Sequence, residues 1–164
     1  GSLGAQSVNK VLREALPELL PQFDVCHICG KGNLDASLND TAGYRQLEFV
    51  DKDLPDLLAT ADLVLSRAGS NALCEFQALG KPMLLVPYPK GASRGDQILN
   101  AESFRKRGFS HVLDQAELTP DRLIKEVISL YHDRGALFDA MVGDEQGTDG
   151  VERVLEQIYK YAKK

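Results

Sequence analysis

A strand, a tight turn and a helix in the middle of the chain most constrain how this sequence can fold. The apolar run Leu63-Val64-Leu65 predicts a buried strand, and the residues after the turn predict a helix that ends at Gly80. We expect Gly69 to supply the backbone freedom that the turn needs, and Ser70 or Asn71 to cap the helix. The first N–H groups of this helix would then lie beyond the strand end, where an anion can bind.

Two charged residues flank the predicted helix start. Arg67 carries a planar guanidinium that suits phosphate oxygens, and Glu75 lies one turn after Asn71, projecting back toward the helix N-terminus. A phosphate and a neighbouring sugar diol would satisfy both side chains. Each feature alone is more often a simple cap or a surface ion pair. Their concentration within the ten residues 66–75 favours a binding site.

Short apolar runs alternate with amphipathic helices along the rest of the chain. The predicted strands cover residues 25–29, 47–50, 63–65, 82–87 and 111–113. The predicted helices cover residues 8–19, 54–61, 70–79, 96–107, 119–131 and 151–159, the last after a flexible break at 143–150. This alternation predicts an α/β domain with a doubly wound, Rossmann-like parallel sheet, whose ligands bind at the carboxyl ends of the strands.

Composition narrows the class of protein. With 164 residues, of which 43% are hydrophobic, the chain can bury one core and is expected to form one domain. A net charge of -5 gives no support for nucleic-acid binding. The absence of a long apolar stretch and of a signal peptide predicts a cytoplasmic chain. Three cysteines agree with a reducing compartment.

The chain opens on Gly1-Ser2-Leu3-Gly4-Ala5, a glycine-rich turn that runs into a helix. A turn of this kind normally follows a strand, so we expect a fragment whose first strand is missing. Gly1-Ser2 could also be a cloning remnant.

Other motifs are weighed against ordinary structural roles. Cys26-His27-Ile28-Cys29 does not predict a metal site, because residues three apart in a strand face opposite sides and no second ligand pair exists. Gly30-Lys31-Gly32 lacks the pattern of a nucleotide-binding loop and is expected to be a turn. Near residue 96, Asp96, Gln97 and Asn100 bring hydrogen-bonding groups to a helix start on the predicted rim. They are equally compatible with a helix cap and two solvated amides.

Several segments, in order, resemble the donor-binding domain of the GT-B glycosyltransferases of the MurG family. The resemblance covers nearly the whole chain and rests on residues 1–5, which match most of a Gly-Gly-Ser-x-Gly-Ala loop, and on residues 27–32, 66–75, 86–87 and 97–101. It implies that residues 1–164 are one half of a GT-B fold, the UDP-sugar-binding domain of a two-domain enzyme. The N-terminal acceptor domain would lie outside this chain.

The resemblance also implies a set of donor-binding residues. They are Ser2, Leu3, Gly4, Phe49, Val50, Arg67, Gly69, Ser70, Asn71, Ala72, Leu73, Glu75, Asp96, Gln97 and Asn100. Ser2 and its glycine neighbours would face the diphosphate, together with Arg67 and the amides at the helix start. The Val50 main chain would bind uracil beside Phe49. Glu75 would hold the ribose hydroxyls and Gln97 the sugar hydroxyls. Some family members carry glutamine at the position of Asp96, so its role here is open.

The function that the resemblance implies is a step of peptidoglycan synthesis, and hence of cell-wall growth, cell shape and division. N-acetylglucosamine would pass from UDP-N-acetylglucosamine to a lipid-linked muramoyl pentapeptide, with inversion and without metal or cofactor. Arg67 would act catalytically by stabilising the leaving diphosphate. The complete enzyme would lie at the inner face of the plasma membrane as a peripheral protein. The alternatives are another GT-B transferase with a different donor or acceptor, and a non-catalytic module that binds nucleotide sugars.

Overall fold

The computed structural model describes residues 5–91 and 95–144. Its helices and strands alternate as predicted, with two short 3-10 turns between them. The elements are α1 (Gln6–Leu19), β1 (Val25–Ile28), η1 (Ala36–Leu38), β2 (Tyr44–Leu47), α2 (Leu54–Thr60), β3 (Val64–Ser66), α3 (Ser70–Ala78), β4 (Met83–Leu85), α4 (Asp96–Lys106), β5 (Ser110–Val112), η2 (Gln115–Glu117) and α5 (Pro120–Val142). The predicted site residues Ser2, Leu3 and Gly4 and the predicted helix at 151–159 lie outside the described residues.

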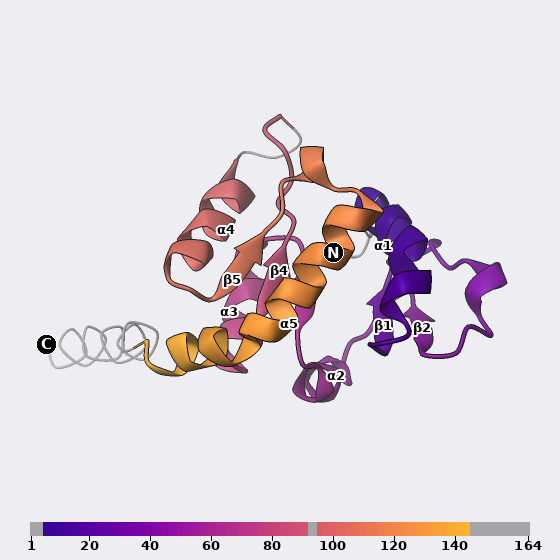
Figure 1. Ribbon diagram of the computed structural model, residues 1–164, viewed down its shortest axis with the longest axis horizontal. Helices are drawn as coiled ribbons and strands as arrows, with labels where there is room; N and C mark the ends of the chain where they lie inside the picture. The colour runs from indigo at the N-terminus through magenta and orange to yellow at the C-terminus, as the bar shows by residue number, and fades with distance from the viewer. Residues whose placement is uncertain (1–4, 92–94, 145–164) are drawn as a thin grey trace, which may run out of the picture.

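All strand pairs are parallel, as the alternation predicted, but the described strands form two sheets instead of one. One sheet has the order β1-β2 and the other the order β3-β4-β5. The central strand β4 lies within the strand predicted at residues 82–87 and is completely buried, as a strand covered on both faces of a parallel sheet should be. The two sheets lie side by side in Figure 1, with β5 and β4 on the left and β1 and β2 on the right.

Helix α5 joins the two halves of the molecule. It contacts β4 and β5 of one sheet and packs along α1, which covers the other (Figure 1). The predicted helix start is confirmed, because the Thr119 side chain accepts a hydrogen bond from the Arg122 N–H and Pro120 occupies the first helical position. Leu123 and Leu130, at helical spacing, are completely buried.

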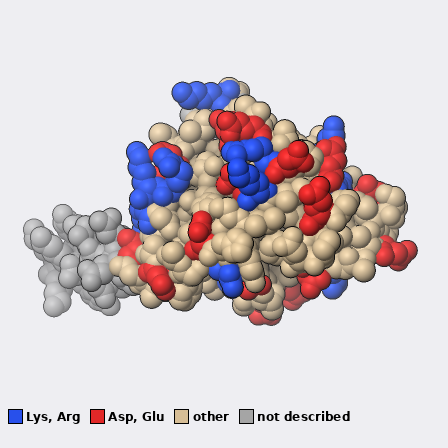
Figure 2. All heavy atoms as spheres, viewed as in Figure 1, with Lys and Arg blue, Asp and Glu red and all other residues tan. Residues whose placement is uncertain are grey.

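Charged side chains on the face of α5 that Figure 2 shows lie as neighbouring pairs of opposite sign. Arg122 Nη2 lies 3.3 Å from Glu126 Oε1 and 3.5 Å from Glu117 Oε2. His111 Nε2 on β5 lies 3.2 Å from Asp133 Oδ2. Arg122 and Glu117 are exposed and Glu126 is partly buried, so each ion pair of Arg122 contributes about 1 kcal/mol or less. These surface pairs therefore contribute little to the stability of the fold.

The second strand was predicted at the wrong place. The apolar residues from Leu47 to Val50 suggested a strand there, but β2 ends at Leu47 and begins at Tyr44. Tyr44 is buried and pairs in register with Val25, directly after Gly43, whose φ of 77° makes the turn into the strand. Residues 48–50 therefore follow the strand instead of forming it.

Two further expectations need correction. Gly69 is the N-cap of α3, and the structure gives neither Ser70 nor Asn71 that role. The φ of Gly69 is -72° with ψ 134°, which any residue can adopt, so the turn does not need the freedom of glycine. Leu99 on α4 is an apolar residue with 73% of its surface exposed.

A buried polar network connects α1 to the first sheet. Asn9 Nδ2 donates to the Cys29 carbonyl at 2.7 Å, so its Oδ1 is the acceptor that faces His27 Nε2 at 2.9 Å. Tyr44 Oη lies 2.7 Å from His27 Nδ1 and donates to it. His27 is therefore neutral with its proton on Nε2. Burial of the ring, and secondly the positive charge of Arg13, lower the pKa of His27 to about 4.

Gly80 ends α3 in the left-handed region and is expected to be intolerant of a side chain. Its φ is 60°, and a Cβ built on it would lie 2.7 Å from Cε2 of Phe138. We expect Gly80→Ala to lower the free energy of unfolding by about 1–3 kcal/mol in urea titrations. Gly135→Ala is the matched control, because Gly135 lies within α5 with open space around it and should stabilise by up to about 1 kcal/mol. A neutral Gly80→Ala would contradict this account of the packing.

Candidate functional site

Arg67 is the centre of a set of contacts at the carboxyl ends of the strands. Its Nη1 donates to the carbonyl of Val86 at 2.9 Å and to that of Pro87 at 3.3 Å, just after β4. Its Nη2 donates to Ser7 Oγ of α1 at 2.9 Å. The guanidinium also stacks on the ring of Tyr88, with 4.1 Å from Cζ to the ring centroid. Arg67 therefore ties the ends of β3 and β4 to the start of α1.

These contacts occupy most of the hydrogen-bond donors of Arg67. Of its five N–H groups, both on Nη1 and one on Nη2 already have protein acceptors. The Nε atom is buried without a partner among the described residues. Burial lowers the pKa of Arg67, and nearby Tyr88 opposes that shift. With these contacts kept, one N–H on Nη2 is left for a ligand, and the guanidinium also holds the chain around the helix start.

The start of α3 offers free main-chain donors. The first helical N–H with an acceptor in the helix belongs to Leu73, which donates to the Gly69 carbonyl at 3.1 Å. The N–H groups of Ser70, Asn71 and Ala72 precede it and have no partner among the described residues. The side chain of Leu73 is 1% exposed, so this residue packs in the core and offers neither a free amide nor an exposed side chain.

Space is available at the same place. A Cβ built on Gly69 would meet nothing within 4 Å. Since neither the φ angle nor the packing requires glycine there, the missing side chain leaves the start of α3 open to a close approach. Ser70 and Asn71 are exposed beside it. The arrangement suits an anion that must reach the main chain.

Glu75 lies on the same helix and is exposed. In the part of the chain that the structure describes, its carboxylate makes no ion pair and no hydrogen bond. It is therefore not buried against Arg67, which is the arrangement that would have removed it from a site. Its oxygens remain available to accept hydroxyl protons.

The start of α4 is joined to the same rim by two amide side chains. Gln97 Oε1 accepts a hydrogen bond from the Tyr88 N–H at 3.3 Å, which leaves its Nε2 group to donate elsewhere. Asn100 Nδ2 donates to the Ala68 carbonyl at 3.1 Å and so holds the turn before α3. Asp96 is the exposed first residue of α4 and not its cap, because Gly95 occupies that position. The negative charge of Asp96 interacts favourably with the positive end of the dipole of α4.

Phe49 and Val50 follow the carboxyl end of β2. Phe49 lies in the loop after β2 with 66% of its surface exposed. Val50 is half-buried, and its main-chain N–H and carbonyl make no hydrogen bond to any described residue. The pair thus presents an aromatic face next to an unused donor and acceptor.

Sequence reasoning missed Ser7 and Tyr88, both of which contact Arg67. Ser7 lies in the first turn of α1, close behind the glycine-rich opening, and Tyr88 directly follows the proline that ends the β4 segment. The hydroxyl of Ser7 at a helix start and the ring of Tyr88 at a strand end could each have suggested a site residue from the sequence. Their meaning depends on Arg67, which is 60 residues from Ser7, so the sequence alone could not pair them.

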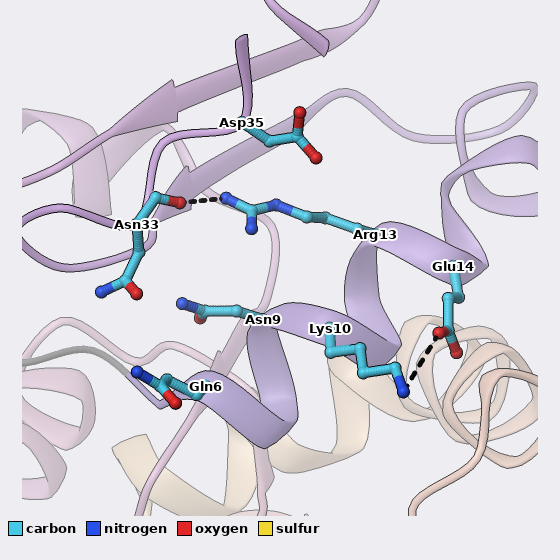
Figure 3. Close-up of a pocket in the computed structure, with 7 residues that line it drawn as sticks. All are labelled: Gln6, Asn9, Lys10, Arg13, Glu14, Asn33 and Asp35. Atoms are coloured by element: carbon cyan, nitrogen blue, oxygen red, sulfur yellow. Dashed lines mark hydrogen bonds and ion pairs between the residues drawn. The ribbon is translucent and has the colours of Figure 1, made fainter. Parts of the chain in front are cut away.

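A hollow, which we call the α1 cleft, lies between α1 and the loop after β1. It is open to solvent, has a volume of about 320 Å³ and is lined by Gln6, Asn9, Lys10, Arg13, Glu14, Asn33 and Asp35. Figure 3 shows Arg13 reaching across it to the Asn33 carbonyl, and Lys10 paired with Glu14 on the helix. Arg13 also donates to Gln46 Oε1 at 3.0 Å. Its cations and carboxylates balance and already have partners, so the cleft shows no preference for an anion.

Two features are absent from residues 5–91 and 95–144. No cluster of three or more metal-ligating side chains occurs there. Cys29 is buried and Cys26 is exposed. No helix in these residues is both long and apolar enough to cross a bilayer.

Comparison with known proteins identifies the family. Residues 1–157 match the model of the glycosyltransferase family 28 C-terminal domain. The chain belongs to this family. It is 51% identical over 158 residues to UDP-N-acetylglucosamine--N-acetylmuramyl-(pentapeptide) pyrophosphoryl-undecaprenol N-acetylglucosamine transferase 3 of Bacillus thuringiensis (strain Al Hakam), covering 96% of this chain and 45% of that protein. A Clostridium botulinum (strain Hall) transferase of the same description, without a number, is 47% identical over 163 residues, 99% of this chain and 46% of that protein. The chain thus spans about half the length of these relatives.

Solved structures agree with the assignment to this family. MurG of Acinetobacter baumannii matches 96% of this chain and 48% of its own, with a TM-score of 0.74 and 26% identity. The glycotransferase of kitacinnamycin matches 98% of this chain and 41% of its own, with a TM-score of 0.78. At 22% identity the latter shows the fold alone. This member of glycosyltransferase family 28 therefore has the fold of one half of a GT-B enzyme, as its sequence predicted.

Proposed function

We propose that this chain is the donor-binding half of an enzyme that transfers N-acetylglucosamine from UDP-N-acetylglucosamine to an undecaprenyl-diphosphate-linked muramoyl pentapeptide in peptidoglycan synthesis. The observation that carries the proposal is the open start of α3 at the carboxyl ends of the parallel strands. Three free N–H groups, the gap at Gly69 and the cation of Arg67 meet there. The names of the curated relatives supply the donor and the acceptor.

The donor is proposed to lie along this rim. The amides of Ser70, Asn71 and Ala72 bind the diphosphate, where the helix dipole favours negative charge. The Glu75 carboxylate accepts hydrogen bonds from the ribose hydroxyls, because two adjacent hydroxyls suit its two oxygens. The unused main-chain groups of Val50 bind the uracil edge.

The transfer itself follows from these contacts. The 4-hydroxyl of the acceptor sugar attacks the anomeric carbon of the donor, the glycosidic bond to UDP breaks, and the configuration inverts. Negative charge then grows on the diphosphate, and the start of α3 stabilises it. Arg67 serves mainly as a positioning residue in this account, since its contacts to Ser7 and to the end of β4 hold the site together. The group that deprotonates the acceptor belongs to the other half of the enzyme.

The acceptor implies a membrane location. A polyprenyl-linked substrate stays in the bilayer, so the complete enzyme is proposed to be a peripheral protein at the inner face of the plasma membrane. Contacts with the lipid are assigned to the N-terminal half, which also completes the cleft for the acceptor. This chain is proposed to bind the donor without transferring it.

Gln97 is expected to provide the sugar specificity. Its Nε2 group is free to donate to a sugar hydroxyl while Oε1 holds Tyr88. In calorimetric titrations, Gln97→Ala should weaken UDP-N-acetylglucosamine binding about five- to tenfold and leave UDP binding unchanged. Gln22→Ala, an exposed glutamine in the turn after α1, should alter neither affinity. Equal losses for both ligands, or stronger binding of UDP-glucose by the unaltered chain, would contradict the proposal.

A further inference from the structure

The segment Pro87-Tyr88-Pro89, which follows β4, is stiff and carries a single main-chain hydrogen-bond donor. The rings of the two prolines fix their own φ angles, and Pro89 also holds the residue before it, Tyr88, in an extended conformation. Neither proline has a main-chain N–H, so the N–H of Tyr88 is the only one in the segment. A group that accepts this hydrogen bond is therefore held at a defined place beside the strand end.

The group that accepts it is the side-chain amide of Gln97. Oε1 of Gln97, in the first turn of α4, lies 3.3 Å from the Tyr88 nitrogen. An amide side chain carries its acceptor and its donor on different atoms, so with Oε1 directed at Tyr88 the Nε2 group is the part that can reach a ligand. The main chain of Tyr88 thus determines that Gln97 offers a hydrogen-bond donor to the site.

The ring of Tyr88 holds a second residue of the site. It stacks on the guanidinium of Arg67, with 4.1 Å from Cζ to the ring centroid. The two carbonyls before Tyr88 accept hydrogen bonds from Nη1 of the same guanidinium, at 2.9 Å for Val86 and 3.3 Å for Pro87. Residues 86–88 therefore fix the plane of the guanidinium, and with it the direction of the Nη2 N–H that is left for a ligand.

We propose that Tyr88 is a positioning residue of the UDP-sugar site, which holds Arg67 with its ring and Gln97 with its main-chain N–H. This inference rests on the proposed function, in which Arg67 lies at the diphosphate end of the site and Gln97 at the sugar end. Both contacts come from one residue between two prolines. Tyr88 therefore sets the spacing between the group that meets the diphosphate and the group that meets the sugar.

Hydrogen exchange in the ligand-free chain tests the contact with Arg67. The Nε atom of Arg67 is buried and has no partner among the described residues, so Tyr88→Leu should expose it. Its N–H, followed by NMR, should exchange at least about tenfold faster in Tyr88→Leu. Tyr88→Phe keeps the ring and should restore slow exchange. Tyr131→Leu is the matched control, because Tyr131 is a half-buried tyrosine on α5 whose ring lies 3.9 Å from Cζ of Arg134.

Calorimetric titration tests the consequence for binding. If Arg67 is correctly placed in only a fraction of the molecules, the affinity falls by that fraction. Tyr88→Leu should weaken UDP and UDP-N-acetylglucosamine binding equally, by about five- to tenfold, as the loss of a partly buried cation–π contact predicts. Tyr88→Phe and Tyr131→Leu should stay within about twofold of the unaltered chain. The ratio of the two affinities should not change in Tyr88→Leu, because leucine keeps the N–H that holds Gln97.

A proline at position 88 tests the contact with Gln97. Tyr88→Pro removes the N–H as well as the ring, and the extended conformation expected before Pro89 is one that proline can adopt. Compared with Tyr88→Leu, this variant should bind UDP equally well and UDP-N-acetylglucosamine about three- to tenfold more weakly, as the loss of one hydrogen-bonded contact predicts.

Three results would overturn the proposal. The first is Tyr88→Leu with slow exchange at Arg67 and full affinity for UDP. The second is Tyr88→Phe as weak as Tyr88→Leu, which would assign the effect to the hydroxyl instead of the ring. The third is a folded Tyr88→Pro with the affinity ratio of Tyr88→Leu. Failure of the proposed function looks different, because the unaltered chain would then bind no UDP. The exchange at Arg67 would decide the role of Tyr88 in that case also.

Discussion

Replacing Glu75 with alanine is expected to weaken UDP binding by about ten- to a hundredfold. The carboxylate is exposed on α3 and makes no ion pair to any described residue, so it is free to accept hydrogen bonds from the ribose. Hydrogen bonds to a charged group are worth about 1.5–3 kcal/mol, which corresponds to this loss. Calorimetric titration of both proteins with UDP measures it.

A modified ligand shows whether the loss comes from the ribose. The unaltered chain should bind 2′-deoxy-UDP more weakly than UDP, because one hydroxyl is missing. Glu75→Ala should bind the two nucleotides equally, since the group that distinguishes them is gone. Glu75→Gln keeps the shape of the side chain and loses its charge. Its preference for UDP over 2′-deoxy-UDP should therefore lie between those of the unaltered chain and of Glu75→Ala. A full preference for UDP over 2′-deoxy-UDP in Glu75→Ala would remove Glu75 from the ribose site.

Acidification is expected to destabilise the fold through His27. The pKa of His27 is about 4 in the folded chain and about 6.5 when unfolded, because the ring is buried between Asn9 and Tyr44. A pKa that folding lowers gives stability that is complete above pH 6.5 and is lost as the pH falls toward 4. The contribution of His27 should decrease by about 2 kcal/mol between pH 7 and pH 5. Urea unfolding at these pH values measures it.

A variant separates His27 from the other titrating groups. His27→Gln keeps a side chain that can donate and accept but does not titrate, while His111, His132 and the carboxylates remain. The difference in unfolding free energy between the two proteins should therefore shrink by about 2 kcal/mol from pH 7 to pH 5. A difference that stays constant over this range would show that His27 is protonated with little cost in the folded chain.

Local patterns predicted the order of the elements well because the signals were local. The apolar run of β4 between two prolines, and Thr119 followed by Pro120, depend on neighbouring residues alone, and both are confirmed. The family motif at residues 66–75 likewise lies on one strand end and one helix start. Predictions that rest on neighbouring residues do not depend on how distant parts of the chain pack together.

The remaining features depend on contacts between distant residues. The sequence could not show that the N–H groups of Arg67 donate to Ser7 and to the carbonyls after β4. Ser7 is 60 residues away along the chain, and the two carbonyls are 19 and 20 residues away. The position of β2 depended on how Tyr44 pairs with Val25, which apolar content alone does not reveal. The division into two sheets depends on which strands pair edge to edge, and the sequence of a single strand does not reveal its partner.

Mapping UDP by NMR tests the central claim most directly. Amide resonances of the chain are followed as UDP is added. We predict that the largest shifts fall on Ser70, Asn71 and Ala72 at the start of α3 and on Val50 after β2. Largest shifts around the α1 cleft, with the start of α3 unchanged, would contradict a donor site at the carboxyl ends of the strands.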